Sequence, residues 1–146
     1  MRHSCHTERK GYSMKIIKRL IILNPQSRHG KAARDFSKIF PGLQKRFGEG
    51  IEVHETTASG HATEIVRATL LENTNYEQII VAGGDGTIRE AVSGYFDKNG
   101  DSSRQDMPLG GIDLGTGGDF FRTITELSDD YNSAIDANSF SVIDCG

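Results

Sequence analysis

Glycines surround a single carboxylate in residues 81–87, which read Val-Ala-Gly-Gly-Asp-Gly-Thr. Glycine has no Cβ, so a loop built from it can take positive φ and approach a bulky anion closely. A helix that begins in this loop would add unpaired backbone N–H groups and the positive end of its dipole, which stabilise phosphate. A bare carboxylate repels phosphate, so Asp85 makes chemical sense if it holds a metal ion or a proton that phosphate chemistry requires. The segment therefore predicts a phosphate site that includes Asp85.

A purely structural explanation of the same residues competes with this one. Glycines between a strand and a helix are often plain turn residues, and an aspartate there often caps the helix. A second glycine-rich loop, residues 115–122, follows another apolar run and also holds one aspartate and one threonine. Two such loops are difficult to explain as turns alone. They suit a nucleoside triphosphate with Mg²⁺, which bridges phosphate oxygens to carboxylates.

Neither of the two common nucleotide fingerprints is present. No Gly-x4-Gly-Lys-Ser/Thr occurs, which excludes a P-loop enzyme. No Gly-x-Gly-x-x-Gly occurs either, because Arg89 and Phe120 stand where the third glycine would be. An ordinary dinucleotide-binding loop is therefore disfavoured.

Further polar residues follow the expected ends of strands. Asn24 and Ser27, after the apolar run 19–23, can hydrogen-bond a nucleotide or its phosphates, and Lys31 can add charge. An Asx turn with a helix cap explains Asn24 and Ser27 equally well. His61 could serve as a general base, but one histidine at the start of a helix is more often solvated or capping.

The spacing of apolar residues predicts alternating strands and helices. Short apolar runs at 19–23, 78–82, 108–112 and 140–146 predict buried strands, and the alternation over 51–55 predicts a strand nearer an edge. Helical spacing predicts helices over 32–40, 62–70, 88–95 and 129–137. In an open α/β sheet, ligands lie at the carboxyl ends of the strands, where we expect both glycine loops.

Composition narrows the class of protein. The chain has 146 residues, 36% hydrophobic content and 17 glycines, which suits one loop-rich α/β domain with a substantial core. No apolar stretch approaches the roughly 20 residues that span a bilayer, and no signal-peptide core is present, so we expect a cytoplasmic location. Cys5 and Cys145 lie at opposite ends of the sequence, which argues against a disulfide framework.

Charge is unevenly distributed, although the net charge is only −3. Residues 1–19 carry six Lys or Arg against Glu8 alone, a local +5, whereas the remainder sums to −8. An acidic body argues against nucleic acid as a partner. The basic segment could touch an anionic membrane surface, but a disordered extension is the simpler expectation.

Residues 83–87 followed by Glu90 resemble the signature of the diacylglycerol kinase catalytic family. That family includes bacterial lipid kinases and sphingosine kinases, and it shares the Gly-Gly-Asp-Gly loop with NAD kinases. Residues 24–27 resemble its opening Asn-Pro-x-Ser segment, with Arg28 where glycine is usual. Residues 115–122 resemble its Gly-Thr-x-Asn-Asp-Phe-x-Arg stretch, but Gly118 replaces the asparagine and Asp113 replaces a preceding proline. Residues 140–146 resemble its apolar-Asp-apolar-Gly segment.

This resemblance implies a fold, a reaction and a boundary. The fold would be α/β, a three-layer Rossmann-like domain with a mainly parallel sheet, NAD kinase/diacylglycerol kinase-like, over residues 19–146. A basic, disordered tail would precede it at 1–18, and the family's β-rich C-terminal domain would be absent. The implied reaction is Mg²⁺-dependent transfer of the ATP γ-phosphoryl group to a lipid hydroxyl, with diacylglycerol or a related lipid as acceptor. The isolated chain would then bind nucleotide weakly and turn over little.

The resemblance also assigns residues to the site. Asp85 is implied as the catalytic group, at the position that NAD kinases use in their catalytic loop. Asp85, Asp119 and Asp144 would hold Mg²⁺, mainly through water. The implied nucleotide contacts are Asn24, Pro25, Ser27, Arg28, Thr57, Gly83, Gly84, Asp85, Gly86, Thr87, Glu90, Gly115 and Thr116.

Two other functions stay open. An NAD kinase-type or sugar-type phosphotransferase shares the glycine loop, although residues 24–27 and 119–122 favour the lipid kinase. A catalytically inactive nucleotide-binding module is suggested by the departures at Arg28, Asp113 and Gly118. A peripheral membrane contact and a homodimer also stay open.

Overall fold

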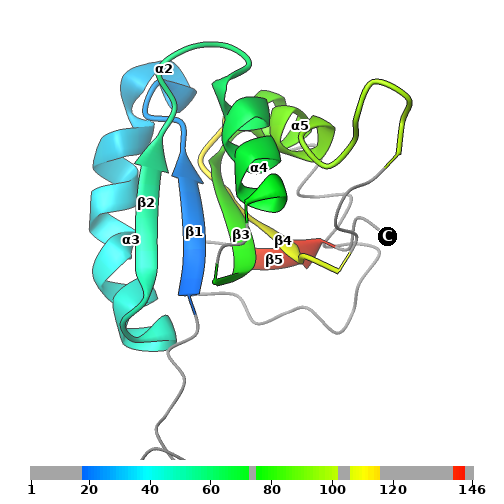
Figure 1. The fold of residues 1–146 in the computed structure, drawn as a ribbon. Helices are drawn as coiled ribbons and strands as arrows, with labels where there is room; N and C mark the ends of the chain where they lie inside the picture. Colours follow the sequence, from blue (N-terminus) through cyan, green and yellow to red (C-terminus); the bar gives the residue numbers. More distant parts are fainter. Residues whose placement is uncertain (1–17, 73–74, 102–105, 116–139, 144–146) are drawn as a thin grey trace, which may run out of the picture.

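A five-stranded sheet forms the centre of the molecule (Figure 1). The computed structural model describes residues 18–72, 75–101, 106–115 and 140–143. The strand order is β2-β1-β3-β4-β5. The first four of these strands are parallel, whereas β5 pairs with β4 in the antiparallel direction. The strands are β1 (Lys18–Leu23), β2 (Ile51–Glu55), β3 (Tyr76–Gly83), β4 (Leu109–Asp113) and β5 (Phe140–Ile143).

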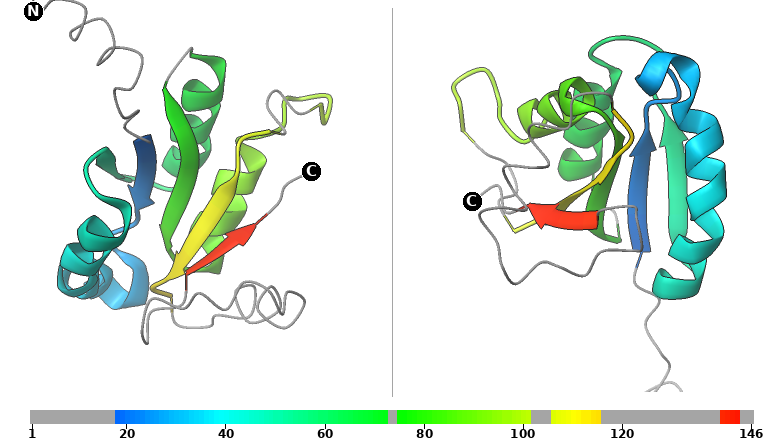
Figure 2. Two further views of the ribbon diagram at one scale, coloured as in Figure 1. Left: turned by 90° about the horizontal axis from the view of Figure 1, so that it is seen from below. Right: turned by 180° about the vertical axis from the view of Figure 1, so that it is seen from behind.

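Helices cover both faces of the sheet, which gives three layers (Figures 1 and 2). Helix α3 packs on one face, and α4 and α5 pack on the other. The predicted mainly parallel α/β fold is therefore confirmed. No helix among the described residues is long and apolar enough to cross a bilayer. The helical segments are α2 (Ser27–Gly30), α3 (Ala32–Phe47), α4 (His61–Leu71) and α5 (Asp85–Ser93).

The central strands are buried on both faces, as their uninterrupted apolar sequences predict. Along β1, Leu20 and Ile22 belong to the core shared with α4 and α5. Ile21 and Leu23, which point to the opposite face, belong to the core under α3. Strand β2 has no fully buried residue, in agreement with its predicted place at an edge.

Helices α4 and α5 approach each other closely at Gly94, which follows the last residue of α5. A Cβ at Gly94 would lie 2.6 Å from the Cβ of Val66 and 2.8 Å from the carbonyl oxygen of Thr63, both on α4. Atoms in a packed interior do not approach this closely, so only glycine fits here. Arg67 of α4 adds a hydrogen bond to the carbonyl oxygen of Phe96, at 3.1 Å. The two helices therefore form one packed unit.

The observed elements differ from the predicted ones mainly at the ends of helices. Helix α3 continues through Pro41 to Phe47, whereas the apolar spacing predicted a helix only to residue 40. Leu43 is 1% exposed, and Phe47 packs against the same core, so burial compensates for the N–H that Pro41 lacks. Tyr95 lies beyond the end of α5, although it is buried and its hydroxyl donates to the carbonyl oxygen of Met107, at 2.9 Å. The predicted helix over 129–137 lies outside the described residues, as do residues 144–146.

Candidate functional site

Three parallel strands end at the same edge of the sheet, and their following loops meet there. After β1, the backbone N–H of Asn24 donates to the carbonyl oxygen of Ala82 on β3, at 2.9 Å. After β4, the backbone N–H of Leu114 donates to the carbonyl oxygen of Gly83, also at 2.9 Å. The end of β3 therefore holds both neighbouring loops in place. This is the edge at which open α/β sheets bind ligands.

The two glycine loops touch each other through their backbones. A Cβ at Gly115 would lie 2.5 Å from the Cα of Gly84, and a Cβ at Gly84 would lie 3.1 Å from the Cα of Gly115. A Cβ at Gly115 would therefore force the loops apart, because a backbone atom cannot move aside as a flexible side chain can, whereas a Cβ at Gly84 would be tight and require a smaller shift. Thr116, the next residue of the second loop, lies outside the described residues.

The loop after β1 is tied to helix α5 by side chains. Asn24 Nδ2 donates to Thr87 Oγ1 at 2.9 Å, and Thr87 is 5% exposed. The Oδ1 of Asn24 accepts the backbone N–H of Gln26 at 3.1 Å, so the Asx turn considered above is also present. Gly83 is packed against the same threonine, since a Cβ there would lie 2.9 Å from Thr87 Oγ1. Asn24 thus shapes the loop and connects it to the glycine segment.

Asp85 stands in the first turn of α5 and does not cap it. The N-cap residue is Gly84, and no side chain forms a cap hydrogen bond there. The Oδ1 of Asp85 is buried and has no hydrogen-bond partner among the described residues. A buried carboxylate oxygen without a partner is unfavourable unless another group, such as a cation or a proton donor, satisfies it.

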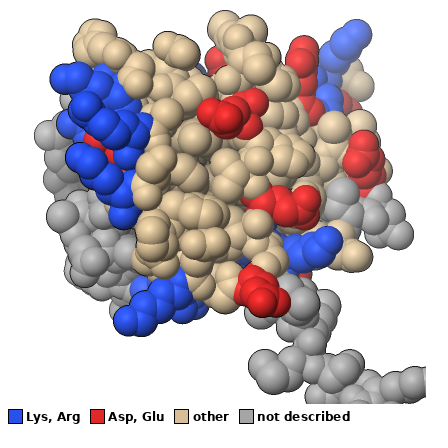
Figure 3. Space-filling view, turned by 90° about the vertical axis from the view of Figure 1, so that its left-hand side faces the viewer, with Lys and Arg blue, Asp and Glu red and all other residues tan. Residues whose placement is uncertain are grey.

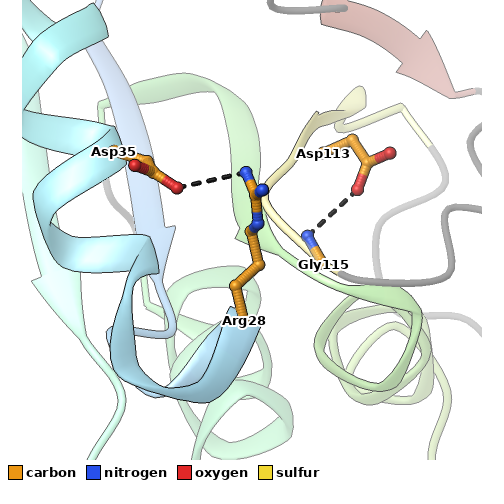
Figure 4. Close-up of polar contacts among 4 residues, drawn as sticks. All are labelled: Arg28, Asp35, Asp113 and Gly115. Atoms are coloured by element: carbon orange, nitrogen blue, oxygen red, sulfur yellow. Dashed lines mark hydrogen bonds and ion pairs between the residues drawn. The ribbon is translucent and has the colours of Figure 1, made fainter.

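Arg28 lies in the turn α2 with its backbone in the left-handed region, at φ 55° and ψ 44°. Its Nη1 forms an ion pair with Asp35 Oδ2 of α3, at 3.1 Å (Figure 4). The glycine expected here by resemblance would adopt this backbone conformation freely. The departure at Arg28 therefore changes the side chain while the turn keeps a glycine-like shape.

Asp113 ends strand β4 and shapes the second glycine loop. Its Oδ1 accepts the backbone N–H of Gly115 at 3.0 Å (Figure 4). This Asx turn holds Gly115 in its position against Gly84. Where the resemblance leads us to expect the rigidity of proline, a side-chain hydrogen bond constrains the backbone instead.

A cavity of about 400 Å³ opens between the loop after β1, the loop after β2 and the start of α5. Predicted nucleotide contacts make up much of its wall: Asn24, Ser27, Thr57, Gly84, Gly86, Thr87 and Glu90. Four residues that were not predicted complete it: Gln26, Thr56, Ala58 and Ser59. Other predicted site residues lie outside its lining: Pro25, Arg28, Gly83, Asp85 and Gly115.

The loop over residues 56–60, between β2 and α4, supplies three of the four lining residues that the sequence interpretation missed. This loop follows the carboxyl end of β2, at the edge of the sheet where the site lies. That position is the one feature of the sequence that indicated it. Its first residue is fixed to the sheet, because the backbone N–H of Thr56 donates to the carbonyl oxygen of Leu23 at 2.8 Å. Its last residue, Gly60, donates its backbone N–H to Glu90 Oε1 at 3.0 Å. Glu90 therefore connects α5 to this loop while it also lines the cavity.

The predicted metal ligands are only partly described. Asp119 and Asp144 lie outside the described residues, so the carboxylate set with Asp85 stays a prediction. Within the described part of the chain, no three or more His, Cys, Asp or Glu side chains gather in a way that could hold a metal ion.

Most of the chain matches one known protein family. The model of the diacylglycerol kinase catalytic domain matches residues 18–143. The chain belongs to this family. Residues 24–27, 83–87 and 115–122, from which the resemblance was inferred, lie within the matched range. The family match begins at Lys18, the first residue of β1.

Several curated relatives are lipid kinases by name. The sphingoid long-chain bases kinase 1 of Arabidopsis thaliana is 31% identical over 118 residues, which is 81% of this chain and 15% of that protein. The mitochondrial acylglycerol kinase of Homo sapiens is 35% identical over 67% of this chain and 22% of its own length. A diacylglycerol kinase of Staphylococcus saprophyticus is 35% identical over 80% of this chain and 35% of its own length. The chain thus spans well under half of each relative.

A solved structure confirms the fold. The crystal structure of a diacylglycerol kinase from Bacillus anthracis aligns with 81% of this chain and 40% of that chain. The TM-score is 0.60, and the aligned sequences are 29% identical. The matched part is therefore the same kind of domain, and it makes up less than half of that enzyme.

Proposed function

We propose that this chain is the nucleotide-binding half of an ATP-dependent lipid kinase. The observation that carries this proposal is the cavity at the carboxyl edge of the sheet, beside the point where Gly84 and Gly115 touch. Two backbone loops in contact at the start of a helix suit the binding of a triphosphate, because both can present N–H groups without steric obstruction. The family match and the names of the relatives support a lipid hydroxyl as acceptor.

The chain's own residues would act by positioning. Asn24 and Thr87 lie in the cavity wall next to the glycine segment, where they can hydrogen-bond phosphate or ribose oxygens. The free backbone N–H groups at the start of α5 would face the phosphates. Phosphoryl transfer requires aligned reactants and neutralised charge more than covalent chemistry from the protein. Binding geometry is therefore the main contribution that we assign to this half.

Mg²⁺ fits the residues that are described. The unpartnered buried Oδ1 of Asp85 is a hard oxygen donor beside the glycine loop, which is the kind of ligand that Mg²⁺ binds directly or through water. When bound, the ion would neutralise phosphate charge. Asp119 and Asp144 remain proposed partners of Asp85 in holding it.

A titration with ATP, with and without Mg²⁺, tests the proposal. We expect the wild-type chain to bind ATP weakly and more tightly with Mg²⁺. Asp85→Asn should weaken binding in the presence of Mg²⁺ by about ten- to hundredfold, the effect of losing one charged partner. Asp97→Asn is the matched control, because it removes the same charge from an exposed loop away from the cavity.

Each outcome discriminates between the candidate functions. Absence of ATP binding in every condition would contradict the proposal and favour a degenerate, non-enzymatic module, as the departures at Arg28, Asp113 and Gly118 suggest. The Asp113 side chain accepts the Gly115 N–H and keeps the second glycine loop in place, which supports the kinase, whereas Arg28 keeps the shape of its turn at the cost of a left-handed backbone. A screen of lipid, NAD and sugar acceptors with a longer chain that includes the second domain would separate a lipid kinase from an NAD kinase-type enzyme. Robust lipid phosphorylation by the present chain alone would refute the assignment of a nucleotide-binding half.

We further propose a cytoplasmic protein that touches an anionic membrane surface, where a lipid acceptor resides. Basic side chains gather on the α3 side of the face shown in Figure 3. Exposed cations recur at helical spacing along the outer face of α3: Lys31 beside its first residue, then Arg34, Lys38 and Lys45. The one acidic residue of α3, Asp35, is paired with Arg28. A homodimer is compatible with this arrangement. Measurement of the molecular mass in solution tests whether it forms.

A further inference from the structure

The loop over residues 56–60 forms one wall of the cavity without belonging to a helix or a strand. Thr56, Thr57, Ala58 and Ser59 all line the cavity, and three of the four are exposed. Regular hydrogen bonding does not fix the shape of such a loop, so individual contacts must do so. Two side chains make these contacts, one at each end of the loop.

His61 makes the contact at the start. Its Nδ1 accepts the backbone N–H of Thr57 at 3.0 Å, and it lies 3.2 Å from the Oγ1 of the same residue. A ring nitrogen that accepts an N–H carries no proton, so this contact requires Nδ1 to be unprotonated. The ring is therefore used as an acceptor for the loop and is not among the residues that line the cavity.

Glu90 makes the contact at the end. Its Oε1 accepts the backbone N–H of Gly60 at 3.0 Å and lies 3.5 Å from Ser59 Oγ. Its carbonyl oxygen accepts the hydroxyl of Thr63, at 2.7 Å. Gly60 has φ 85°, a conformation that glycine takes easily, so the chain can turn into α4 at this point. Backbone hydrogen bonds also hold the loop, because the N–H of Thr56 donates to the carbonyl oxygen of Leu23 at 2.8 Å and the N–H of His61 donates to that of Ala58 at 3.2 Å. The contact at Thr57 constrains the residue between these two.

We propose that His61 is a positioning residue for the bound nucleotide, acting through Thr57. This inference rests on the proposed function, because it takes the cavity as the nucleotide site. The unprotonated Nδ1 holds the Thr57 backbone and directs where its hydroxyl lies at the cavity wall. The Nδ1 of His61 is engaged by Thr57, so this nitrogen is not free to act as a general base.

Replacement of His61 by Asn, Gln or Leu tests whether a hydrogen-bond acceptor at the position of Nδ1 is needed for ATP affinity. Asparagine places its Oδ1 near the position of Nδ1 and can accept the Thr57 N–H, whereas glutamine carries its oxygen one bond farther out. Leucine removes the acceptor and keeps a similar bulk. We expect His61→Asn to bind ATP within about twofold of wild type, and the Gln and Leu variants to bind about two- to tenfold more weakly, the effect of one lost hydrogen bond.

His54→Leu is the matched control, because it removes an exposed imidazole from the edge strand β2 outside the cavity lining. It should bind ATP like wild type. Thermal unfolding of each variant shows whether the fold is retained. The comparison of Asn with Gln stays informative even if the leucine variant unfolds, since both are polar amides at the same position. Equal affinities for the Asn and Gln variants would overturn the inference.

Amide hydrogen exchange at Thr57 measures the contact itself, without nucleotide. We expect slow exchange in wild type and His61→Asn, and exchange that is several-fold faster in His61→Gln. Equal exchange in all three would overturn the positioning role. A wild-type chain that shows this exchange pattern but binds no ATP would instead overturn the proposed function, so the two failures are distinguishable.

Discussion

Arg28 takes a backbone conformation that L-residues with a side chain avoid. Its φ of 55° and that of His29, 56°, place two consecutive non-glycine residues in the left-handed region. Such residues cost roughly 1–2 kcal/mol each because Cβ crowds the following carbonyl oxygen. The surface ion pair with Asp35 offsets only part of this cost. The turn α2 is therefore strained at the position where the resemblance leads us to expect glycine.

Arg28→Gly and Arg28→Ala separate the backbone effect from the ion pair. Both variants lose the contact with Asp35, but only glycine accepts the left-handed backbone without strain. We expect Arg28→Gly to be more stable than Arg28→Ala by about 1 kcal/mol in denaturant unfolding. Equal stabilities would show that the turn rearranges to relieve the strain.

Some residues named from the sequence line the cavity, whereas other residues that line it were not named. Asn24 and Thr87 were named individually, and the structure places them 2.9 Å apart. Their hydrogen bond spans 63 positions, so no local pattern could predict it. Gln26 and Ser59 were missed because their polar side chains look like those of any surface loop. Their place in the cavity wall depends on how neighbouring strands end.

At the scale of elements, the strands were easier to predict than the helices. Uninterrupted apolar runs over 20–23 and 79–82 indicate the buried parts of β1 and β3, because a strand buried on both faces is apolar on both. The apolar spacing predicted a helix only over 32–40, whereas α3 continues through Pro41, a residue that usually ends a helix. Leu43 and Phe47 continue to bury apolar surface beyond it, and this tertiary gain exceeds the local penalty.

The contact between the two glycine loops is the most constrained feature of the site. Gly115→Ala would place a Cβ 2.5 Å from the Cα of Gly84, so the loops would have to separate. We expect a loss of about 1–3 kcal/mol in the free energy of unfolding, as for other overpacked substitutions, together with weaker ATP binding. Calorimetric titration and denaturant unfolding measure the two effects.

Gly42→Ala is the control for that variant. A Cβ there meets nothing within 4 Å, and Gly42 lies inside α3. Alanine should therefore stabilise the chain by about 0.5–1 kcal/mol through helix propensity and leave ATP affinity unchanged. If Gly115→Ala behaved in the same way, the two loops would not be in contact in solution.

On the scale of the whole molecule, charge is segregated between layers. The α2 and α3 layer carries Arg28, Lys31, Arg34, Lys38, Lys45 and Arg46 against Asp35 alone. Acidic residues predominate in the remaining described part of the chain. The chain therefore has two basic regions: residues 1–19 and the surface of α2 and α3. The sequence alone did not indicate that the second region forms one face of the molecule.

Binding to lipid vesicles tests the membrane-facing role of α3. We expect the chain to bind vesicles that contain anionic phospholipid and not purely zwitterionic ones, with affinity that falls as salt rises. Arg34→Gln with Lys38→Gln should weaken this binding by roughly thirtyfold, since each basic residue near the surface contributes roughly 1 kcal/mol and 1.4 kcal/mol corresponds to a factor of ten. Arg89→Gln with Lys98→Gln removes two exposed cations from elsewhere and should have little effect. Equal losses in the two pairs would mean that net charge matters and the face of α3 does not.

The tight junction at Gly94 has a mechanical consequence. Because α4 and α5 pack tightly at this position, the loops that precede them are attached to one rigid unit. The two sides of the cavity that these loops form are therefore expected to move together. Among the described residues of the rim, the turn α2 has no buried residue. We therefore expect the backbone movement that admits or releases a ligand to be larger at this turn than at the loops that precede α4 and α5.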